Sequence, residues 1–278
     1  MSVIIGIDVG GSTTKIVGFS RNGDKCELIG PQFVRANDPI TATYGAFGKF
    51  TDENRISIKD IDKIMMTGVG SSFVKRDLYG LECVKVPEFG AIGRGGLYIS
   101  GLSNAVVVSM GTGTAIVHAT EKEMKYLGGT GVGGGSLMGL SKLLLSAETV
   151  EHIEEYAAQG NIANVDLRIK DITAKGEKLL VEDLTASNFG NLSDLATKDD
   201  IALGILNMVY ETIGMVSIFA ARSVGVDNIV LTGNLTRLAY CHEKFDFYNS
   251  IKSIYGMNFM IPECAEYATV IGTALQGF

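Results

Sequence analysis

Two short segments of this chain share one pattern, in which an apolar strand turns at glycines and small hydroxyl residues and then resumes as a second strand. The first segment is "GIDVGGSTTKIV" (6–17) and the second is "VVSMGTGTAIVH" (107–118). Each turn is flanked by β-branched residues, which is typical of a tight hairpin. A hairpin that occurs twice, about a hundred residues apart, predicts a duplicated α/β fold with a cleft between the two copies.

The rest of the chain supplies further elements to each copy. We predict an N-terminal lobe over residues 1–103 and a C-terminal lobe over 104–278, with the last helix packing back toward the N-terminal lobe. Apolar residues at helical spacing predict a long helix over 201–224 whose apolar stripe packs in the core. The other expected elements are strands at 25–30, 62–70 and 228–238, a short extended run at 82–89, and helices at 37–56 and 267–278.

Composition excludes several classes of protein. The chain has 278 residues and a net charge of −7. Acidic chains bind nucleic acid and anionic membranes poorly, so we expect neither as a partner. The N-terminus has no basic start followed by a cleavage site, and the apolar runs are short, so we expect a cytoplasmic protein. The four cysteines form no C-x-x-C pair, which indicates neither a zinc ribbon nor a disulfide framework.

The two turns have the chemistry of a phosphate site. Successive backbone N–H groups in such a turn converge into an anion-binding nest, so two facing turns can hold a triphosphate from both sides. Asp8 stands where a carboxylate can bind Mg²⁺, an ion that needs few protein carboxylates because it keeps waters and phosphate oxygens. We therefore predict ATP and Mg²⁺ as cofactors. The predicted ligands are Asp8 for the metal, Gly10, Gly11, Ser12, Thr13 and Lys15 from the first turn, and Gly111, Thr112, Gly113 and Thr114 from the second.

A third glycine turn follows late in the chain, in "LTGNLTR" (231–237), and contributes Gly233 and Asn234 to the predicted nucleotide site. Taken in order, the three turns resemble the phosphate-1, phosphate-2 and adenosine motifs of the actin/hexokinase/Hsp70 superfamily. The resemblance implies an α/β, duplicated actin-like ATPase fold with ribonuclease H-like lobes. It also implies that ATP binds in the cleft between the two lobes.

Further segments narrow this resemblance. The chain resembles the type II, eukaryotic-like pantothenate kinases in "PEFGA" (87–91), "GGTGVGGGSLMGLSKLL" (128–144), "EDLTASNFG" (182–190) and "GNLTRL" (233–238). The resemblance implies ATP-dependent phosphorylation of the primary hydroxyl of pantothenate, the first step of coenzyme A biosynthesis. It also implies a homodimer built largely on the helix at 201–224.

The glycine-rich segment is expected to open a helix that begins near Ser136. Glycine amides at a helix N-terminus favour a bound anion. We therefore add four glycines to the predicted nucleotide contacts, namely Gly131, Gly133, Gly134 and Gly135.

The resemblance at "PEFGA" places Glu88 as the catalytic residue. A primary alcohol is a weak nucleophile, so a positioned carboxylate base assists its attack on the γ-phosphorus of ATP. Most of the remaining catalysis of phosphoryl transfer comes from positioning and charge neutralisation.

The acceptor side departs from the family pattern at several positions. Ala115 stands where the family commonly has a serine that contacts pantothenate, and Tyr126, beside Lys125, stands where it has an arginine. Gly90 and Arg94 replace a common aspartate and glutamine. We expect the acceptor to lie near Thr112, Ala115, Tyr126 and Arg94. A related alcohol with less charge, such as pantetheine, is the alternative acceptor.

Three other classes of function remain open from the sequence. An ATPase activator of the 2-hydroxyacyl-CoA dehydratase type shares the superfamily, but it holds an iron–sulfur cluster on closely placed cysteines, and no cysteine lies between Cys83 and Cys241. A sugar kinase of the repressor/kinase group usually carries a clustered Cys/His zinc site, and this sequence has no such cluster, which argues against that class. A non-catalytic nucleotide-binding homologue would keep the fold without turnover.

Overall fold

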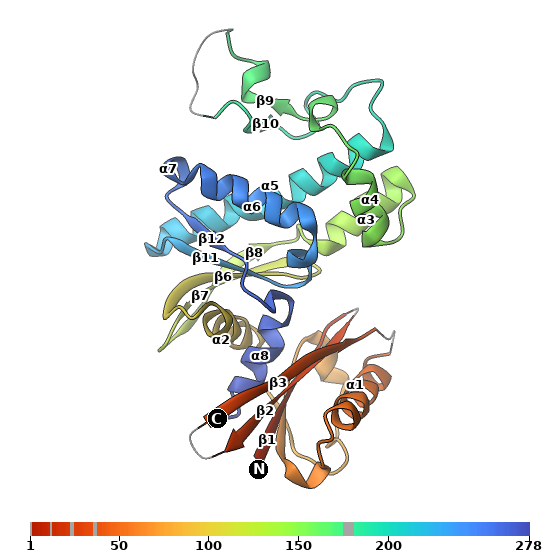
Figure 1. The fold of residues 1–278 in the computed structure, drawn as a ribbon, viewed down its shortest axis with the longest axis vertical. Coiled ribbons are helices and arrows are strands. Elements are labelled where there is room, and N and C mark those ends of the chain that lie inside the picture. Colours follow the sequence, from red (N-terminus) through yellow and green to blue (C-terminus); the bar gives the residue numbers. More distant parts are fainter. Residues whose placement is uncertain (1, 12, 23–24, 36–37, 175–180) are drawn as a thin grey trace.

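The computed structural model describes residues 2–11, 13–22, 25–35, 38–174 and 181–278. These residues form two lobes, each built on a five-stranded sheet (Figure 1). Ser12, a predicted nucleotide contact, lies outside the described residues.

The first sheet begins with the first glycine hairpin. Strands β1 (Ser2–Val9) and β2 (Thr14–Asn22) are antiparallel, with Asp8 directly opposite Lys15. Strand β3 (Lys25–Val34) continues the meander beside β2. On the other side, β4 (Ile61–Thr67) runs parallel to β1, and β5 (Cys83–Lys85) runs parallel to β4. The strand order is β3-β2-β1-β4-β5.

The second sheet repeats this plan. Strands β6 (Asn104–Met110), β7 (Thr114–Thr120) and β8 (Met124–Thr130) form an antiparallel meander. Strands β11 (Asn228–Thr232) and β12 (Asn258–Met260) add in parallel on the other side of β6. Read in reverse, as β8-β7-β6-β11-β12, the order matches β3-β2-β1-β4-β5 of the first sheet strand for strand. The predicted duplicated α/β fold is confirmed.

Helices cover the outer faces of the two sheets. In the first lobe, α1 (Pro39–Glu53) packs Ala46, Phe47 and Phe50 onto the sheet, with Asp38 capping its first turn. In the second lobe, α5 (Lys198–Val224) forms the centre of the core, and Ile205, Val209 and Ile213 of its predicted stripe are fully buried. Around α5 lie α3 (Gly134–Leu145), α4 (Val150–Ala157), α6 (Ala239–Ser250) and α7 (Lys252–Tyr255).

Short elements complete the two lobes. The 3₁₀ turns are η1 (Ile58–Asp60), η2 (Val69–Phe73), η3 (Ile162–Asn164), η4 (Ile169–Asp171), η5 (Asn234–Arg237) and η6 (Ala265–Tyr267). Strands β9 (Leu167–Arg168) and β10 (Thr185–Ser187) form a separate two-stranded ribbon at the end of the molecule furthest from the first lobe (Figure 1).

Two helices lie between the sheets and join the lobes (Figure 1). Helix α2 (Glu88–Ser100) buries Ile92 against Val107 and Val117 of the second sheet. Helix α8 (Ala268–Leu275) buries Val270 and Ile271 with β2 of the first sheet. Helix α2 follows the strands of the first lobe in sequence but packs on the second sheet. Helix α8 follows the strands of the second lobe but packs on the first sheet. The division at residues 103 and 104 stays a prediction.

Several sequence-based boundaries differ from the structure. The strands expected over 62–70 and 228–238 end at Thr67 and Thr232, and the strand expected over 25–30 extends to Val34. The extended run expected over 82–89 ends early, since β5 stops at Lys85 and α2 begins at Glu88. Pro87 accounts for this change, because proline cannot donate to a strand ladder but is tolerated at a helix start. The helix expected near Ser136 begins at Gly134.

Helix α5 is the one helix among the described ranges that is long and apolar enough to cross a membrane. However, 61% of its most apolar window is buried inside the protein, and its apolar side chains form the core of the second lobe. Its apolar character is therefore explained by packing.

Candidate active site

Parallel strands of the first sheet bring polar groups to one edge. Asp8 lies one residue before the end of β1, opposite Thr67, which ends β4, and Glu88 begins α2 shortly after β5. The Thr67 hydroxyl donates to the Val86 carbonyl and ties β4 to the segment before Glu88. In open α/β sheets, ligands bind outside the carboxyl ends of parallel strands, and this edge faces the second lobe.

Asp8 is a carboxylate with limited access to water. Burial raises the pKa of the Asp8 carboxyl, and the Lys15 ammonium partly opposes this shift. Gly68 approaches from β4 with φ of +83°, and a Cβ at this position would lie 2.5 Å from Oδ1 of Asp8. Glycine at position 68 is therefore needed both for its backbone conformation and for the space beside the carboxylate. A cation bound at Asp8 would offset the cost of keeping this carboxylate charged.

Lys15 links the two lobes. It is 9% exposed, and its ammonium donates to the backbone carbonyl of Glu266 in the second lobe. The ammonium also lies 5.9 Å from the centre of the Tyr267 ring. Burial lowers the pKa of Lys15, against the influence of Asp8 and Glu266. Lys15 thus places a positive charge at the junction between Asp8 and the second lobe.

The second glycine turn is fixed by the start of α3. The amide of Gly134 donates to the Gly111 carbonyl, and the amide of Gly135 donates to the Thr112 carbonyl, at 2.9 and 2.8 Å. The Thr114 hydroxyl donates to the Val132 carbonyl at 2.8 Å. The amides of Gly134 and Gly135 are therefore used inside the protein. These two bonds hold the second turn against the start of α3, and the predicted nucleotide contacts of Gly134 and Gly135 stay predictions.

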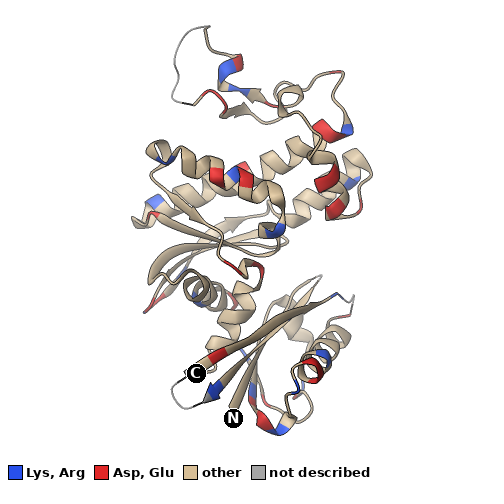
Figure 2. Ribbon diagram, in the orientation of Figure 1, with Lys and Arg blue, Asp and Glu red and all other residues tan. Residues whose placement is uncertain are grey.

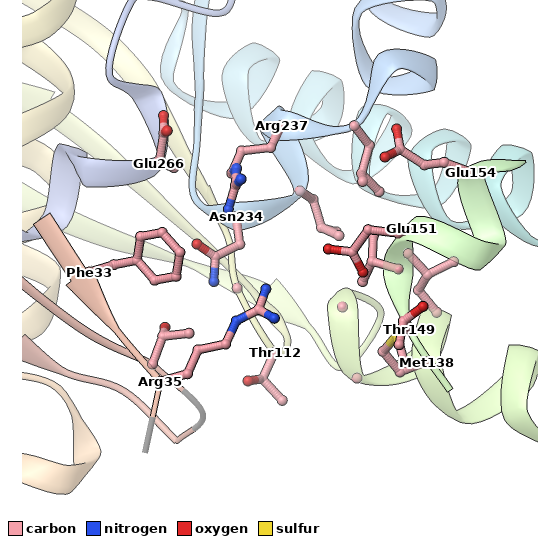
Figure 3. Close-up of a pocket in the computed structure, with 18 of the residues that line it drawn as sticks. Phe33, Arg35, Thr112, Met138, Thr149, Glu151, Glu154, Asn234, Arg237 and Glu266 are labelled. Atoms are coloured by element: carbon pink, nitrogen blue, oxygen red, sulfur yellow. The ribbon is translucent and has the colours of Figure 1, made fainter. Parts of the chain in front are cut away.

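A cavity of about 630 Å³ lies between the lobes at these turns (Figure 3). Of the predicted nucleotide ligands, the cavity wall includes Thr13, Lys15, Gly111, Thr112, Gly134, Gly135 and Asn234. Asp8, Gly10, Gly11, Gly113, Thr114, Gly131, Gly133 and Gly233 belong to the same turns or their flanks but are not part of this wall. The structure therefore brings the three glycine turns to one cavity, and their roles as ligands stay predictions.

Apart from Lys15, the charged residues of the cavity wall were not among the residues predicted from the sequence. Phe33 and Arg35 enter from the end of β3, and Arg237 enters from η5 (Figure 3). Arg237 stands in the quoted "LTGNLTR" turn, so its neighbourhood was visible in the sequence. Arg35 follows a strand end, and only the pairing of β3 with β2 shows that this end faces the cleft.

The opposite wall of the cavity is acidic. Glu148 precedes α4, and Glu151 and Glu154 line the cavity from α4 (Figures 2 and 3). Glu154 accepts a hydrogen bond from the amide of Ala239 at 2.9 Å, which fixes its position. Charge therefore changes sign across the cavity. A ligand with a phosphate end and a hydroxyl-bearing end fits such a site, because carboxylates accept hydrogen bonds from hydroxyl groups.

The predicted base and acceptor residues lie on a neighbouring part of the cleft. Partial burial raises the pKa of Glu88, and the Asp8 carboxylate raises it further. The ring of Phe89 stacks on Tyr126, with centroids 4.0 Å apart and planes 12° from parallel. Ala115 pairs with Gly129 near the start of β7, and Arg94 is exposed on α2, more than one turn beyond Glu88. The acceptor roles of Thr112, Ala115, Tyr126 and Arg94 stay predictions.

The "EDLTASNFG" segment has a packing role in this structure. Thr185 and Asn188 donate to the carboxylate of Glu211 on α5, at 2.7 and 2.9 Å. The Lys244 ammonium pairs with the same carboxylate at 2.6 Å. Asn188 also donates to Asp166, at 3.4 Å. This buried network attaches the segment to α5, away from the cavity wall.

A protein-family model described as Fumble matches residues 104–245 of the chain. A type II pantothenate kinase of Bacillus thuringiensis subsp. konkukian is 30% identical over 245 residues, covering 84% of this chain and 83% of that protein. The chain belongs to the Fumble family. The type II pantothenate kinase of Oceanobacillus iheyensis is 33% identical to this Fumble-family chain over 165 residues, covering 56% of the chain and 62% of that protein.

Solved structures with the same fold come from another group. Component A of the (R)-2-hydroxyglutaryl-CoA dehydratase of Acidaminococcus fermentans superposes with a TM-score of 0.70 at 17% identity, covering 99% of this chain and 97% of that one. The activator of the 2-hydroxyisocaproyl-CoA dehydratase of Clostridium difficile, with bound ADPNP, gives 0.67 at 15% identity, covering 99% and 93%. At these identities the likeness establishes the actin-like ATPase fold of the Fumble-family chain and nothing further.

Proposed function

We propose that this Fumble-family chain is an ATP-dependent kinase that phosphorylates the primary hydroxyl of pantothenate, the first step of coenzyme A biosynthesis. The observation that carries the proposal is a single cavity lined by residues of three glycine turns from two lobes. Beside it, at the edge of the first sheet, lie Asp8 and Glu88, close enough that the Asp8 carboxylate raises the pKa of Glu88. Type II pantothenate kinases similar to this chain over most of its length support the choice of acceptor.

The nucleotide binds with its phosphates at the glycine turns. The turn at Gly111–Thr112 and the Lys15 ammonium face the same space, so both contribute to phosphate binding. In this proposal Asp8 would hold Mg²⁺, because a bound cation would offset the cost of keeping this carboxylate charged, whose pKa burial raises. When bound, the ion neutralises charge on the phosphate oxygens.

Glu88 accepts the proton of the acceptor hydroxyl. A base is most effective when its pKa lies near the working pH, and the pKa of Glu88 is raised in that direction. Its position at the start of α2, beside the end of β1, sets it on the same edge as Asp8. The alcohol oxygen attacks the γ-phosphorus, the bond to the β-phosphate oxygen breaks, ADP leaves, and the hydroxyl proton passes to the carboxylate of Glu88.

The active form in this proposal is a homodimer in the cytoplasm. An apolar groove between α3 and α5 is lined by Val132, Leu140, Leu143, Met208 and Val209, among others. Leu143 is 78% exposed and Phe219, on α5, is 58% exposed. Exposed apolar surface of this kind favours a second copy as its partner.

An uncharged pantothenate derivative such as pantetheine is a second acceptor. The stacked Phe89 and Tyr126 rings present an aromatic surface beside Glu88. Such a surface binds the amide and thiol chain of pantetheine more readily than the carboxylate of pantothenate.

A coupled assay of ADP release tests the proposed function. Pantothenate, pantetheine and a panel of sugars are compared at equal concentration with Mg²⁺ and ATP. We expect turnover that depends on pantothenate or pantetheine and exceeds the rate with every sugar. Acceptor-independent ATP hydrolysis by a coloured, iron-containing protein would instead support a dehydratase activator.

A further inference from the structure

The cavity wall nearer the first lobe carries more positive charge than its glycine turns require. Lys15, Arg35 and Arg237 line it, and Glu266 is the one acidic residue of that wall. Within the described ranges, neither Arg35 nor Arg237 forms an ion pair or a side-chain hydrogen bond. Two guanidinium groups with unused donors therefore face one cavity.

Both guanidinium groups lie near the same aromatic ring, that of Phe33. The guanidinium carbon of Arg35 lies 5.9 Å from the centre of the Phe33 ring, and that of Arg237 lies 5.7 Å from it. Phe33 and Arg35 are two residues apart at the end of β3, so they lie on one face of the strand. Arg237 ends η5 of the second lobe. The Phe33 ring therefore lies near two guanidinium groups, one from each lobe.

This arrangement is complete only with an anion. Like charges at this spacing repel one another, and a ring face attracts each cation only weakly. Arg237 also disfavours the charged form of Lys15, so these two cations already repel one another at this wall. In Figure 3 both guanidinium groups point into the space between the lobes. The planar fork of arginine matches phosphate oxygens, two N–H groups at a time.

The acidic wall fixes which end of a nucleotide binds here. Glu151 and Glu154, on α4, lie across the cavity from Arg35 (Figure 3). Their carboxylates repel phosphate and accept hydrogen bonds from ribose hydroxyls or the adenine amine. The phosphate chain therefore belongs at the arginine wall and the nucleoside at the α4 wall.

We propose that Arg35 and Arg237 bind the phosphate chain of the nucleotide from opposite lobes, with Phe33 positioning both guanidinium groups. The inference rests on the proposed function only in taking ATP as the ligand. Because the two arginines belong to different lobes, phosphates held between them draw the lobes together. Affinity in this site rises with the number of phosphates.

Calorimetric titration of the full chain with ATP, ADP and AMP, in Mg²⁺ and without acceptor, tests this inference. In the wild type we expect affinity to fall from ATP to ADP to AMP. Arg35→Ala and Arg237→Ala each lower ATP affinity about ten- to hundredfold, the effect of losing a charge-assisted hydrogen bond. AMP affinity changes by less than about threefold, since AMP reaches the arginines with at most one phosphate.

Matched variants separate the effect of the arginine charge on ATP affinity from the effect of the guanidinium geometry. Arg35→Lys and Arg237→Lys keep the charge without the fork and should fall between wild type and alanine. Phe33→Leu removes the ring and should lower ATP affinity about two- to fivefold. Arg76→Ala and Lys122→Ala remove an exposed charge outside the cavity wall in each lobe. Far-UV circular dichroism and thermal melting establish that each variant is folded.

Two results overturn the inference. One is a loss of ATP affinity no greater than in the Arg76→Ala and Lys122→Ala controls. The other is an equal loss for ATP and AMP, which would assign the arginines to the nucleoside end. These titrations use no acceptor. A chain that phosphorylates no pantothenate, yet loses ATP affinity selectively in these variants, would overturn the proposed function and support the arginine pair.

Discussion

The positions of Asp8 and Glu88, and therefore their chemistry, are set by where the strands of the first sheet end. Asp8 and Glu88 are 80 positions apart in sequence, yet parallel pairing of β1, β4 and β5 brings both to one edge. Burial raises the pKa of both carboxyl groups, and the Asp8 carboxylate raises the pKa of Glu88 further. A raised pKa suits a base, and a metal ion at Asp8 would relieve the remaining repulsion. The two acids therefore serve different roles because of their surroundings.

Replacing Glu88 by Gln tests the assignment of the base. The amide keeps the shape of the side chain but cannot accept the hydroxyl proton. We expect turnover to fall by about 10²–10⁴-fold, the usual effect of losing a general base, while ATP affinity stays the same. Steady-state kinetics and calorimetry measure the two quantities. Glu82→Gln, at an exposed position of the same lobe, is the control. Near-normal turnover of the Glu88→Gln enzyme would exclude Glu88 as the base.

The pH dependence of kcat/KM gives a second test. The base must be deprotonated to act, so activity falls as pH drops through the pKa of Glu88. Since that pKa is raised, the acid limb should lie above the value of about 4.3 for an ordinary glutamate. Asp8 also has a raised pKa, but Mg²⁺ competes with its proton. Mg²⁺ at Asp8 would also weaken the repulsion that raises the pKa of Glu88, so the Glu88→Gln enzyme gives the deciding profile. If its residual activity keeps the same acid limb, the limb does not belong to Glu88, and the assignment is contradicted.

At the scale of elements, the packing of α2 on α8 sets the distance between the lobes. A Cβ on Gly95 would collide with the Ala268 carbonyl, and a Cβ on Gly272 would collide with the Ala91 carbonyl. The two helices therefore touch through their backbones. Because Glu88 begins α2, this close contact also fixes the base relative to both sheets.

A substitution at this contact should destabilise the protein. Gly272→Ala forces the helices apart, and overpacking of this kind costs about 1–3 kcal/mol. Gly45→Ala is the control, because Gly45 lies in α1 with open space around it and alanine favours a helix. Urea unfolding measures both. We expect a lower midpoint for Gly272→Ala and an equal or higher one for Gly45→Ala. A wild-type midpoint for Gly272→Ala would show that the helices are not in close contact.

The elements that the sequence predicted well are those defined by local patterns. The hairpins at Gly10 and Gly111, and helix α5, follow from β-branched strands, glycine turns and helical periodicity. The helix start at Glu88 was missed because the strand before it is short and Pro87 obscures the change of period. The arginine pair could not be predicted, because Arg35 and Arg237 meet only through the pairing of β3 and the facing of two lobes.

At the scale of the whole molecule, the groove between α3 and α5 is the surface that we expect to form the dimer. Static light scattering at micromolar concentration should give twice the mass of the 29.6 kDa chain. Leu143→Arg places a charge on a leucine that is 78% exposed and should yield a monomer. Ile58→Arg, at an exposed apolar residue of the first lobe, should stay dimeric. A monomeric wild type would contradict the proposed dimer.

The central claim is that this chain transfers the γ-phosphoryl group of ATP to a pantothenate hydroxyl. Mass spectrometry of the reaction with ¹⁸O-labelled γ-phosphate tests it most directly. We predict a product heavier than pantothenate by one labelled phosphoryl group on the primary hydroxyl, formed in equal amount with ADP. The Glu88→Gln enzyme should form it far more slowly. If wild-type protein that binds ATP releases labelled inorganic phosphate and forms no phosphorylated pantothenate, the account is contradicted.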